Sequence, residues 1–157
     1  GDIGVILNRP TALRTCDLEL PLADELIQRA LSFAGTGPDD WNVWYGGDCQ
    51  GINAPEGEGE LFLTCLHTSD RLSLISDEII KGVYMINFSK ARALVSSKIA
   101  HKDEFFVAVG YCGWAPGQLQ AEVNRGDCWT LAAADQSVLL GQLQRKQAAL
   151  AAGLRAA

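Results

Sequence analysis

A chain of 157 residues with 48% apolar and 20% charged residues has the length of one domain and the composition of a globular protein. Its formal net charge of −6 argues against a large phosphate-contacting surface, because nucleic-acid affinity comes mostly from Lys and Arg side chains. No apolar run approaches the roughly 20 residues of a membrane-spanning helix. We therefore expect a soluble protein, and any targeting segment has been removed or lies outside this sequence.

The cysteines are five in number, and no two of them have the C-x-x-C spacing. A disulfide framework or a zinc ribbon would look different. The pattern predicts free thiols in a reducing compartment, either the cytoplasm or the stroma of a plastid. His67 and His101 are the only histidines, too few for a convincing histidine-based metal site. We expect neither a metal nor a cofactor.

The N-terminal part is predicted to hold two strands and a helix. Ile3–Leu7 is typical of a buried strand, which Asn8–Arg9–Pro10 ends because proline cannot extend a β-ladder. Apolar residues at helical spacing predict a helix over residues 21–34, stopped by a glycine. Val43–Tyr45 predicts a short strand that ends at Gly46–Gly47.

The middle of the chain is predicted to hold three strands and a helix. Leu61–Leu66 predicts a buried strand. Leu74–Ile75 and Gly82–Asn87 predict a strand pair. Ser89 is expected to cap a helix over Lys90–Ile99.

The run Gly110–Glu122 is the densest in special residue types, and it lies between a predicted strand and the end of a predicted helix. Glu104–Val109 is apolar on both faces, as central strands covered on both sides are. A glycine-rich turn, Gly110–Gly117, follows, and then a short helix that Gly126 closes. Leu119 and Val123 lie four residues apart and are expected to face the core.

The rest of the chain completes the predicted architecture. Asp127–Leu131 predicts a short strand, and residues 135–154 predict an alanine- and leucine-rich helix. Strands and helices intermix without strict alternation, which favours an α/β (α+β) fold with a mixed sheet, curled or barrel-like and flanked by helices. We expect one domain over residues 1–134 and a C-terminal helical extension over residues 135–157.

Several short motifs together identify a resemblance. They are Gly4–Pro10 with its N-R-P turn, Tyr45–Gly47, Leu66–His67, Gly110–Trp114 with Gly117–Leu119 and Glu122, and Trp129. In this order and rough spacing they resemble the AlgH/YqgE family, small bacterial proteins with plant and algal relatives. The resemblance covers the chain up to about Asp135.

The resemblance implies a single α/β domain whose bifurcated sheet rolls into a pseudo-barrel. It implies no particular reaction, because the family has no established one. Bacterial members have been linked to transcriptional control of alginate production, which is a poor guide for this acidic chain.

The sequence departs from the family pattern at three places. Family members usually carry a strand and a turn before the N-R-P strand, so we expect an open sheet edge here, or an edge that a partner completes. Asp48 stands where the family commonly has proline, and Cys112 stands where it usually has alanine.

The residues that form the tentative ligand site all fall at predicted strand ends, and we expect one shallow polar pocket from them. They are Asn8, Arg9, Gly46, Gly47, Gly113, Trp114, Gly117 and Gln118. Backbone N–H groups of Gly113 and Gly117 near a helix start would attract a small anion, with Gln118 as a further donor and Trp114 as a stacking surface. The alternative is a tight turn and a tryptophan that fills the core. A P-loop would need Lys and Ser or Thr after its last glycine, so nucleotide hydrolysis is disfavoured.

No residue is assigned a catalytic role. Cys112 could act as a nucleophile with His67 as its base, against the alternative of a buried, inert thiol. His67–Asp70 contains imidazole, hydroxyl and carboxylate groups, but adjacency in sequence does not make a triad.

Three functions remain open, and we rank them. The first is a non-enzymatic binding or accessory protein, for example a subunit of a plastid assembly or a protein peripheral to a membrane complex, with protein partners at the N-terminal sheet edge or the C-terminal helix. The second is an enzyme or sensor that binds a small anionic ligand at the Gly110–Gln118 turn. The third is a transcriptional regulator, although nucleic-acid binding is not expected.

Overall fold

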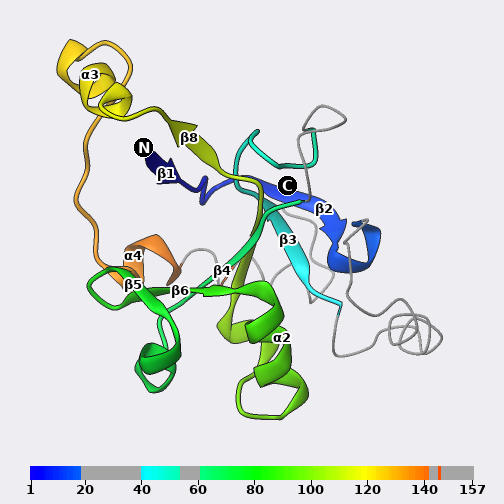
Figure 1. Ribbon diagram of the computed structural model, residues 1–157. Coiled ribbons are helices and arrows are strands. Elements are labelled where there is room, and N and C mark those ends of the chain that lie inside the picture. The colour runs from blue at the N-terminus through cyan, green and yellow to red at the C-terminus, as the bar shows by residue number, and fades with distance from the viewer. Residues whose placement is uncertain (19–39, 54–60, 142–144, 146–157) are drawn as a thin grey trace.

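The computed structural model describes residues 1–18, 40–53, 61–141 and 145 (Figure 1). The strands are β1 (Asp2–Gly4), β2 (Pro10–Arg14), β3 (Asn42–Tyr45), β4 (Leu63–His67), β5 (Asp77–Ile80), β6 (Val83–Asn87), β7 (Phe106–Val109) and β8 (Cys112–Trp114). The α-helices are α2 (Phe88–Ser96), α3 (Gln118–Arg125) and α4 (Gln136–Leu139), and the 3-10 helices are η1 (Thr15–Asp17), η2 (Asp70–Ile75) and η3 (Lys102–Glu104). The predicted helix over residues 21–34 and most of the predicted C-terminal helix lie outside the described residues.

Six of these strands form one mixed sheet in the order β2-β3-β7-β4-β6-β5, and β1 pairs with β8 in a separate sheet (Figure 1). β3 and β7 run parallel, whereas the other neighbours in the larger sheet are antiparallel. The predicted α/β class, with a mixed sheet and flanking helices, is confirmed. Within the described ranges, β2 and β5 are the two edges of the larger sheet.

β7 lies at the centre of this sheet and is buried along its whole length, with no residue more than 4% exposed. Its side chains alternate between two apolar clusters. Val107 packs with the cluster around Trp41, and Phe106 and Ala108 pack with the cluster around Trp44. Fully burying one such side chain contributes roughly 1.5–3 kcal/mol. The prediction of an interior strand over this segment is confirmed.

A different element covers each face of the sheet. Phe88 and Ala91 of α2 belong to the cluster around Trp41. Leu140, directly after α4, is 3% exposed and belongs to the cluster around Trp44. The beginning of the C-terminal segment therefore packs on the sheet, and the division of the chain at residue 135 stays a prediction.

The predicted cap of the helix after β6 is wrong by two residues. Asn87 is the N-cap, and its side-chain oxygen accepts a hydrogen bond from the Ser89 N–H at 2.8 Å. Asn87 also ends β6, so one residue closes the strand and starts α2. The helix ends at Ser96, and Ile99, expected inside the helix, lies beyond it and is 53% exposed.

Two predicted strands are absent. Leu74–Ile75 lies in the 3-10 helix η2, and the partner of β6 is β5 at Asp77–Ile80. Leu74 is 97% exposed, so its apolar character does not reflect a buried strand. Asp127–Leu131 forms no strand either, because this exposed segment is held by side-chain contacts with α3 rather than by a ladder.

The turn after β7 is more elaborate than predicted, because the short strand β8 stands between it and α3. α3 itself begins at Gln118 and is closed by Gly126 in the left-handed conformation (φ +72°), as predicted. Leu119 and Val123 are only half-buried. The helix therefore covers the core less than its apolar spacing predicts.

Candidate functional site

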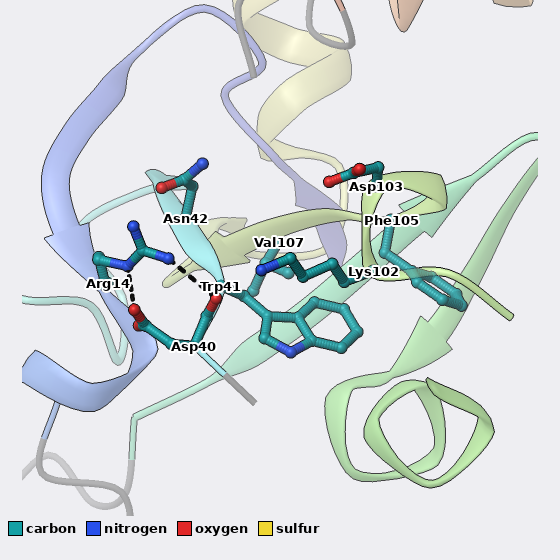
Figure 2. Close-up of a pocket in the computed structure, with 8 residues that line it drawn as sticks. All are labelled: Arg14, Asp40, Trp41, Asn42, Lys102, Asp103, Phe105 and Val107. Carbon is teal, nitrogen blue, oxygen red and sulfur yellow. Dashed lines mark hydrogen bonds and ion pairs between the residues drawn. The ribbon is translucent and has the colours of Figure 1, made fainter. Parts of the chain in front are cut away.

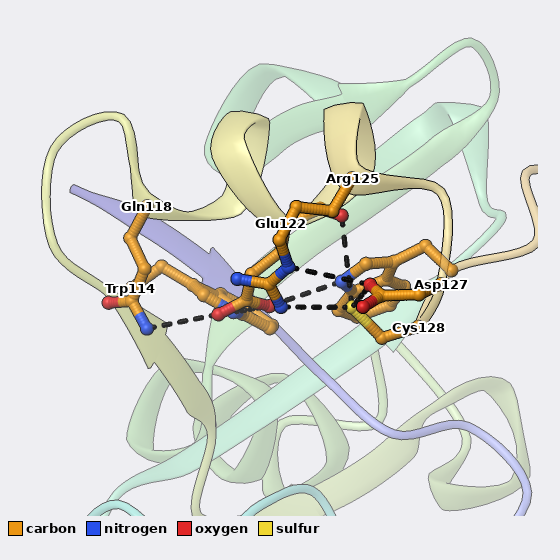
Figure 3. Close-up of polar contacts among 7 residues, drawn as sticks. Trp114, Gln118, Glu122, Arg125, Asp127 and Cys128 are labelled. Atoms are coloured by element: carbon orange, nitrogen blue, oxygen red, sulfur yellow. Dashed lines mark hydrogen bonds and ion pairs between the residues drawn. The ribbon is translucent and has the colours of Figure 1, made fainter.

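The corner formed by β8 and α3 is organised around the carboxylate of Glu122 (Figure 3). Trp114 Nε1 donates a hydrogen bond to Glu122 Oε2 at 3.2 Å, and Gln118 Nε2 donates to Oε1 at 3.1 Å. Trp129 Nε1 donates to Oε2 at 3.1 Å. Three side-chain N–H groups thus converge on one carboxylate, and they explain why the motif has Trp, Gln and Glu at these positions.

The helical repeat accounts for this geometry. Gln118 and Glu122 are four residues apart and lie on the same face of α3. Gln118 Oε1 accepts a hydrogen bond from the Ala115 N–H at 3.0 Å, so the same side chain also closes the turn before the helix. The hydrogen bond from Trp129 is the main cause that holds the pKa of Glu122 below its ordinary value, and those from Gln118 and Trp114 act in the same direction.

A second polar group adjoins this corner at the end of α3 (Figure 3). The Arg125 guanidinium lies 3.4 Å from Asp127 Oδ1 and 3.3 Å from Cys128 Sγ. Cys128 Sγ lies 3.0 Å from the same Asp127 oxygen, and this contact is the main cause of the lowered pKa of Asp127. These exposed contacts fasten the segment after α3 to the helix end.

The glycines at the ends of β3 and β7 serve a backbone crossing. A Cβ on Gly46 would lie 2.3 Å from the Gly110 carbonyl oxygen, and one on Gly47 would lie 2.1 Å from the Tyr111 carbonyl carbon. Gly110 has a φ of +75°, and a Cβ there would lie 2.3 Å from the Gly47 carbonyl oxygen. Only glycine fits at these three positions, because the segments after β3 and after β7 lie too close together to leave room for a Cβ atom.

Gly113 and Gly117 take different places from those expected. Gly113 pairs with Ile3 inside the ladder of β1 and β8, so its backbone is part of a strand and does not start a helix. Gly117 is the N-cap of α3, with a φ of +78° and no atom within 4 Å of a Cβ placed on it. Of the two glycines expected at a helix start, the structure puts one there.

Arg9 belongs to a separate cluster at the end of β3. Its guanidinium lies 5.0 Å from the ring centroid of Tyr45, and its carbonyl oxygen accepts a hydrogen bond from the Tyr45 N–H at 2.9 Å. The Tyr45 hydroxyl donates to Asp48, which raises the pKa of Tyr45. Asn8 is exposed beside this cluster. A single pocket joining Asn8 and Arg9 to the Glu122 corner stays a prediction.

His67 is fully engaged within the fold. It is 1% exposed, its Nε2 lies 2.9 Å from Ser76 Oγ, and its Nδ1 accepts a hydrogen bond from the Ser69 N–H at 3.2 Å. Because Nδ1 accepts a hydrogen bond, the imidazole proton resides on Nε2, which donates a hydrogen bond to Ser76 Oγ. The Ser76 hydroxyl in turn donates to the Leu72 carbonyl oxygen. Desolvation lowers the pKa of His67. A neutral imidazole whose two nitrogens are both hydrogen-bonded within the fold has no nitrogen left to act as the base for a nucleophile.

Cys112 shows no sign of activation as a nucleophile. Its Sγ lies 3.8 Å from the Gly46 carbonyl oxygen, and burial raises the pKa of the thiol. A raised pKa keeps the sulfur protonated, which is the opposite of what nucleophilic catalysis needs. None of the five cysteines forms a disulfide.

A small cavity of about 190 Å³ lies between β3 and η3 (Figure 2). It is lined by Arg14, Asp40, Trp41, Asn42, Lys102, Asp103, Phe105 and Val107. Arg14 pairs with Asp40 across one side of it. Its volume is below the roughly 300–1,000 Å³ of ordinary ligand pockets. Residues 19–39, which precede Asp40, lie outside the described residues, so we build no site on this cavity.

Sequence reasoning missed two features of the molecule. Glu122 and Trp129 were left out of the expected site, although the spacing of four residues between Gln118 and Glu122 was a signal for contact on one helix face. The exposed isoleucines of β5 were also missed, because they fall between the two segments predicted as a strand pair, Leu74–Ile75 and Gly82–Asn87.

Two general properties complete the description of the residues that the structure covers. Within them, no group of three or more His, Cys, Asp and Glu side chains is placed to hold a metal ion. No helix among them has the length and apolarity needed to cross a bilayer.

Comparison with known proteins gives consistent matches. An AlgH-like family model matches residues 1–153. UPF0301 proteins of Bordetella avium and Thiobacillus denitrificans are 27% and 30% identical over 144 and 139 residues, which is 88% of this chain in both cases. The chain spans 61% and 65% of the length of these two relatives, that is, less than two thirds.

One solved structure is similar over almost the whole chain. It is the solution structure of the AlgH protein from Pseudomonas aeruginosa, with a TM-score of 0.60 and 20% sequence identity. The match covers 99% of this chain and 73% of that one. At this level of identity the match shows a shared fold.

Proposed function

The chain belongs to the AlgH-like family, and from that premise we propose that it is a non-catalytic protein that binds a protein partner. The surface that we propose for binding is the β5 patch, which we define as Leu74, Ile75, Ile79 and Ile80. These side chains come from η2 and from the edge strand β5 that follows it.

The exposure of the β5 patch carries the proposal. Leu74 is 97% exposed, Ile75 48%, Ile79 52% and Ile80 44%. Four large aliphatic side chains within seven residues are therefore left in water, at a cost of about 25 cal/mol per Å² of apolar surface. Large exposed apolar patches commonly mark interaction sites, and we propose that these four side chains together form one. A partner that covers these side chains would remove that cost.

The state of the polar side chains supports a non-catalytic role. The imidazole of His67 is occupied on both nitrogens, and the thiol of Cys112 is held in its protonated form. At the Glu122 corner, the side-chain N–H groups of Trp114, Gln118 and Trp129 already bond to a carboxylate of the chain itself. An anionic ligand at the Gly110–Gln118 turn and a role in transcription stay predictions without a specific supporting contact.

We further propose that the protein is an accessory subunit of a larger assembly in a reducing compartment, the cytoplasm or a plastid stroma. Five free cysteines fit such a compartment. The open edge of β1 and the C-terminal helix remain possible additional partner surfaces. The β5 patch is favoured over the edge of β1, because the patch has four exposed aliphatic side chains and β1 has one, Ile3, at 69% exposure.

A comparison of two matched variants tests the proposal. Ile79→Lys places a charge in the β5 patch, and Ile99→Lys makes the same change at an isoleucine that is 53% exposed but lies outside the patch. Tagged wild type and both variants are used to recover partners from a lysate of the source organism, with quantitative mass spectrometry as the readout. We expect one partner to be recovered with the wild type and with Ile99→Lys, and to fall about tenfold with Ile79→Lys.

The recovered partner is then purified and titrated against the three proteins. Binding that survives Ile79→Lys unchanged in both measurements would contradict the proposal. A protein that binds all three equally in the lysate counts as background.

A further inference from the structure

The outer side of β5 is an unpaired edge within the part of the chain that is described. β5 is the last strand in the sheet order, and β6 pairs with it on its inner side only (Figure 1). All four of its residues are exposed. The backbone N–H and C=O groups along such an edge can pair with an added strand.

We propose that β5 accepts an extended segment of a protein partner as a seventh strand, and that this segment carries basic residues followed or preceded by aliphatic ones. The inference rests on the proposed function, since it names how the partner is recognised there. In this mode of recognition the main-chain hydrogen bonds supply affinity, and the side chains next to them supply specificity.

The charge along the edge selects the chemistry of that segment. Asp77 and Glu78 are adjacent and exposed on β5. Glu78 stands beside Tyr84 in the ladder with β6, and its Oε1 accepts a hydrogen bond from the Gly82 N–H at 3.0 Å, which engages one of its two carboxylate oxygens at this end of the strand. Lys81 follows the strand directly. Two carboxylates against one ammonium group make the edge acidic, which favours Lys or Arg in the partner.

The apolar half of the edge selects the rest of the segment. Ile79 and Ile80 follow Glu78 directly, at 52% and 44% exposure. A partner strand therefore meets two acidic positions and then two aliphatic ones. For an antiparallel strand the matching order is two aliphatic residues followed by two basic residues.

A second copy of the chain fits this edge poorly. If two β5 strands paired antiparallel about a two-fold axis, Asp77 would stand opposite Ile80 and Glu78 opposite Ile79, with both carboxylates against apolar side chains. The pairing of β5 with β6 also shifts register between Glu78 and Ile80. This irregularity affects any added strand alike, so the mismatched side-chain pairs are what disfavour a second copy.

Designed peptides test the proposal on the intact protein. The probe is a blocked peptide of sequence Thr-Val-Val-Lys-Lys-Thr, titrated into ¹⁵N-labelled protein at about 0.15 M salt and followed by amide chemical shifts. Three controls share its length. One has the lysines replaced by glutamates, and two carry N-methyl groups on odd or on even residues, which keep charge and apolar area but remove main-chain donors.

We expect saturable shifts at the amides of residues 77–80, and affinity about fivefold or more weaker for the glutamate peptide. One of the two N-methylated peptides is expected to lose about tenfold, because alternate residues of an added strand point their N–H groups at the sheet. In the protein, the double change Asp77→Asn with Glu78→Gln is expected to weaken the lysine peptide about threefold, while Ile99→Lys leaves it unchanged.

The outcomes separate this inference from the proposed function. Strand addition would be overturned by equal binding of all N-methylated and unmethylated peptides, by shifts confined to other residues, or by no binding at all. Loss of the natural partner with Ile79→Lys would in that case still support the β5 patch as a binding surface. Dimers that disappear with Ile79→Lys would assign the edge to a second copy and also overturn it. Peptide binding at β5, with a natural partner indifferent to Ile79→Lys, would support the edge chemistry and refute the proposed function.

Discussion

Trp129 Nε1 donates a hydrogen bond to the carboxylate of Glu122 at 3.1 Å and thereby ties a strandless, exposed segment back onto α3. The Trp114 indole donates to the same oxygen, and the two rings lie 5.8 Å apart between centroids. One acidic side chain therefore positions two tryptophans. The consequence is measurable, because tryptophan emission reports the surroundings of the ring.

Replacing Glu122 with glutamine should loosen this corner. The neutral amide accepts indole hydrogen bonds more weakly than a carboxylate does. We expect Glu122→Gln to shift tryptophan emission to longer wavelength and to lower the melting temperature slightly, with the sheet intact by far-ultraviolet circular dichroism. Gln120→Ala on the same helix is the control, since Gln120 bonds to Asn124 and not to an indole. Identical emission from Glu122→Gln and the wild type would count against the corner as described.

The same corner should respond to acid. Hydrogen bonds from Trp129, Gln118 and Trp114 hold the pKa of Glu122 below its ordinary value of 4.5. A depressed pKa means that the carboxylate adds stability above its unfolded pKa and that this stability is lost as the pH falls through the folded pKa. We expect the emission shift only below pH 4.5, before the circular dichroism changes. In Glu122→Gln this separate step should be missing, and its persistence there would assign it to another group.

His67 should make the fold less stable in mild acid. Burial lowers the pKa of this imidazole from its ordinary value of 6.5. Protonation therefore favours the unfolded chain, so the stabilisation is complete above pH 6.5 and is lost as the pH falls from there toward the folded pKa. Urea denaturation at about pH 7.5 and pH 5.5 measures the loss, and the imidazole resonances of His67 in the folded protein give its protonation directly. A His67 that is already protonated at pH 6.5 in the folded state would refute this account.

Two glycines with nearly the same φ angle should differ in their tolerance of alanine. Gly110 and Gly117 have φ values of +75° and +78°, but a Cβ on Gly110 would meet the Gly47 carbonyl oxygen at 2.3 Å, whereas Gly117 has open space around it. Gly117→Ala should cost about 1–2 kcal/mol, the penalty of the left-handed conformation alone. Gly110→Ala should cost clearly more or prevent folding. Equal costs in urea denaturation would show that the two backbone segments do not cross as closely as described.

The cap of α2 gives a further matched pair. Asn87→Ala removes the side chain that accepts from the Ser89 N–H, and should cost about 1 kcal/mol. Ser89→Ala should stay within about 0.5 kcal/mol of the wild type, because Ser89 supplies only its backbone to the cap. The reverse ranking by thermal or urea denaturation would restore Ser89 as the cap.

The parts of the fold that sequence reasoning predicted are those with strong local signals. β7 is apolar at every position because the sheet buries both of its faces, and α3 ends at Gly126 because the left-handed closing position suits glycine. The failures lie where tertiary contacts decide. Leu74 looked like part of a strand although it is 97% exposed, and the apolar run near Trp129 is held by a hydrogen bond to Glu122 instead of a ladder.

The candidate site was predictable in part for the same reason. The motif around Trp114 and Gln118 does not by itself indicate Glu122 as the group on which its donors converge, and a ligand site at this corner stays a prediction. Gly46 and Gly47 were expected at a ligand, and they lie at a backbone crossing. The exposure of Ile79 and Ile80 depends on β5 being the last strand of the sheet, which is a property of strand order and not of local sequence.

The most direct test of the β5 patch is photo-crosslinking in the source organism. A benzoyl-phenylalanine is placed at Ile79, at 52% exposure, and in a matched strain at Ile99, at 53% exposure. The account predicts one discrete adduct with a partner protein from position 79 and none from position 99. The absence of any adduct at position 79, or the same adducts from both positions, would contradict it.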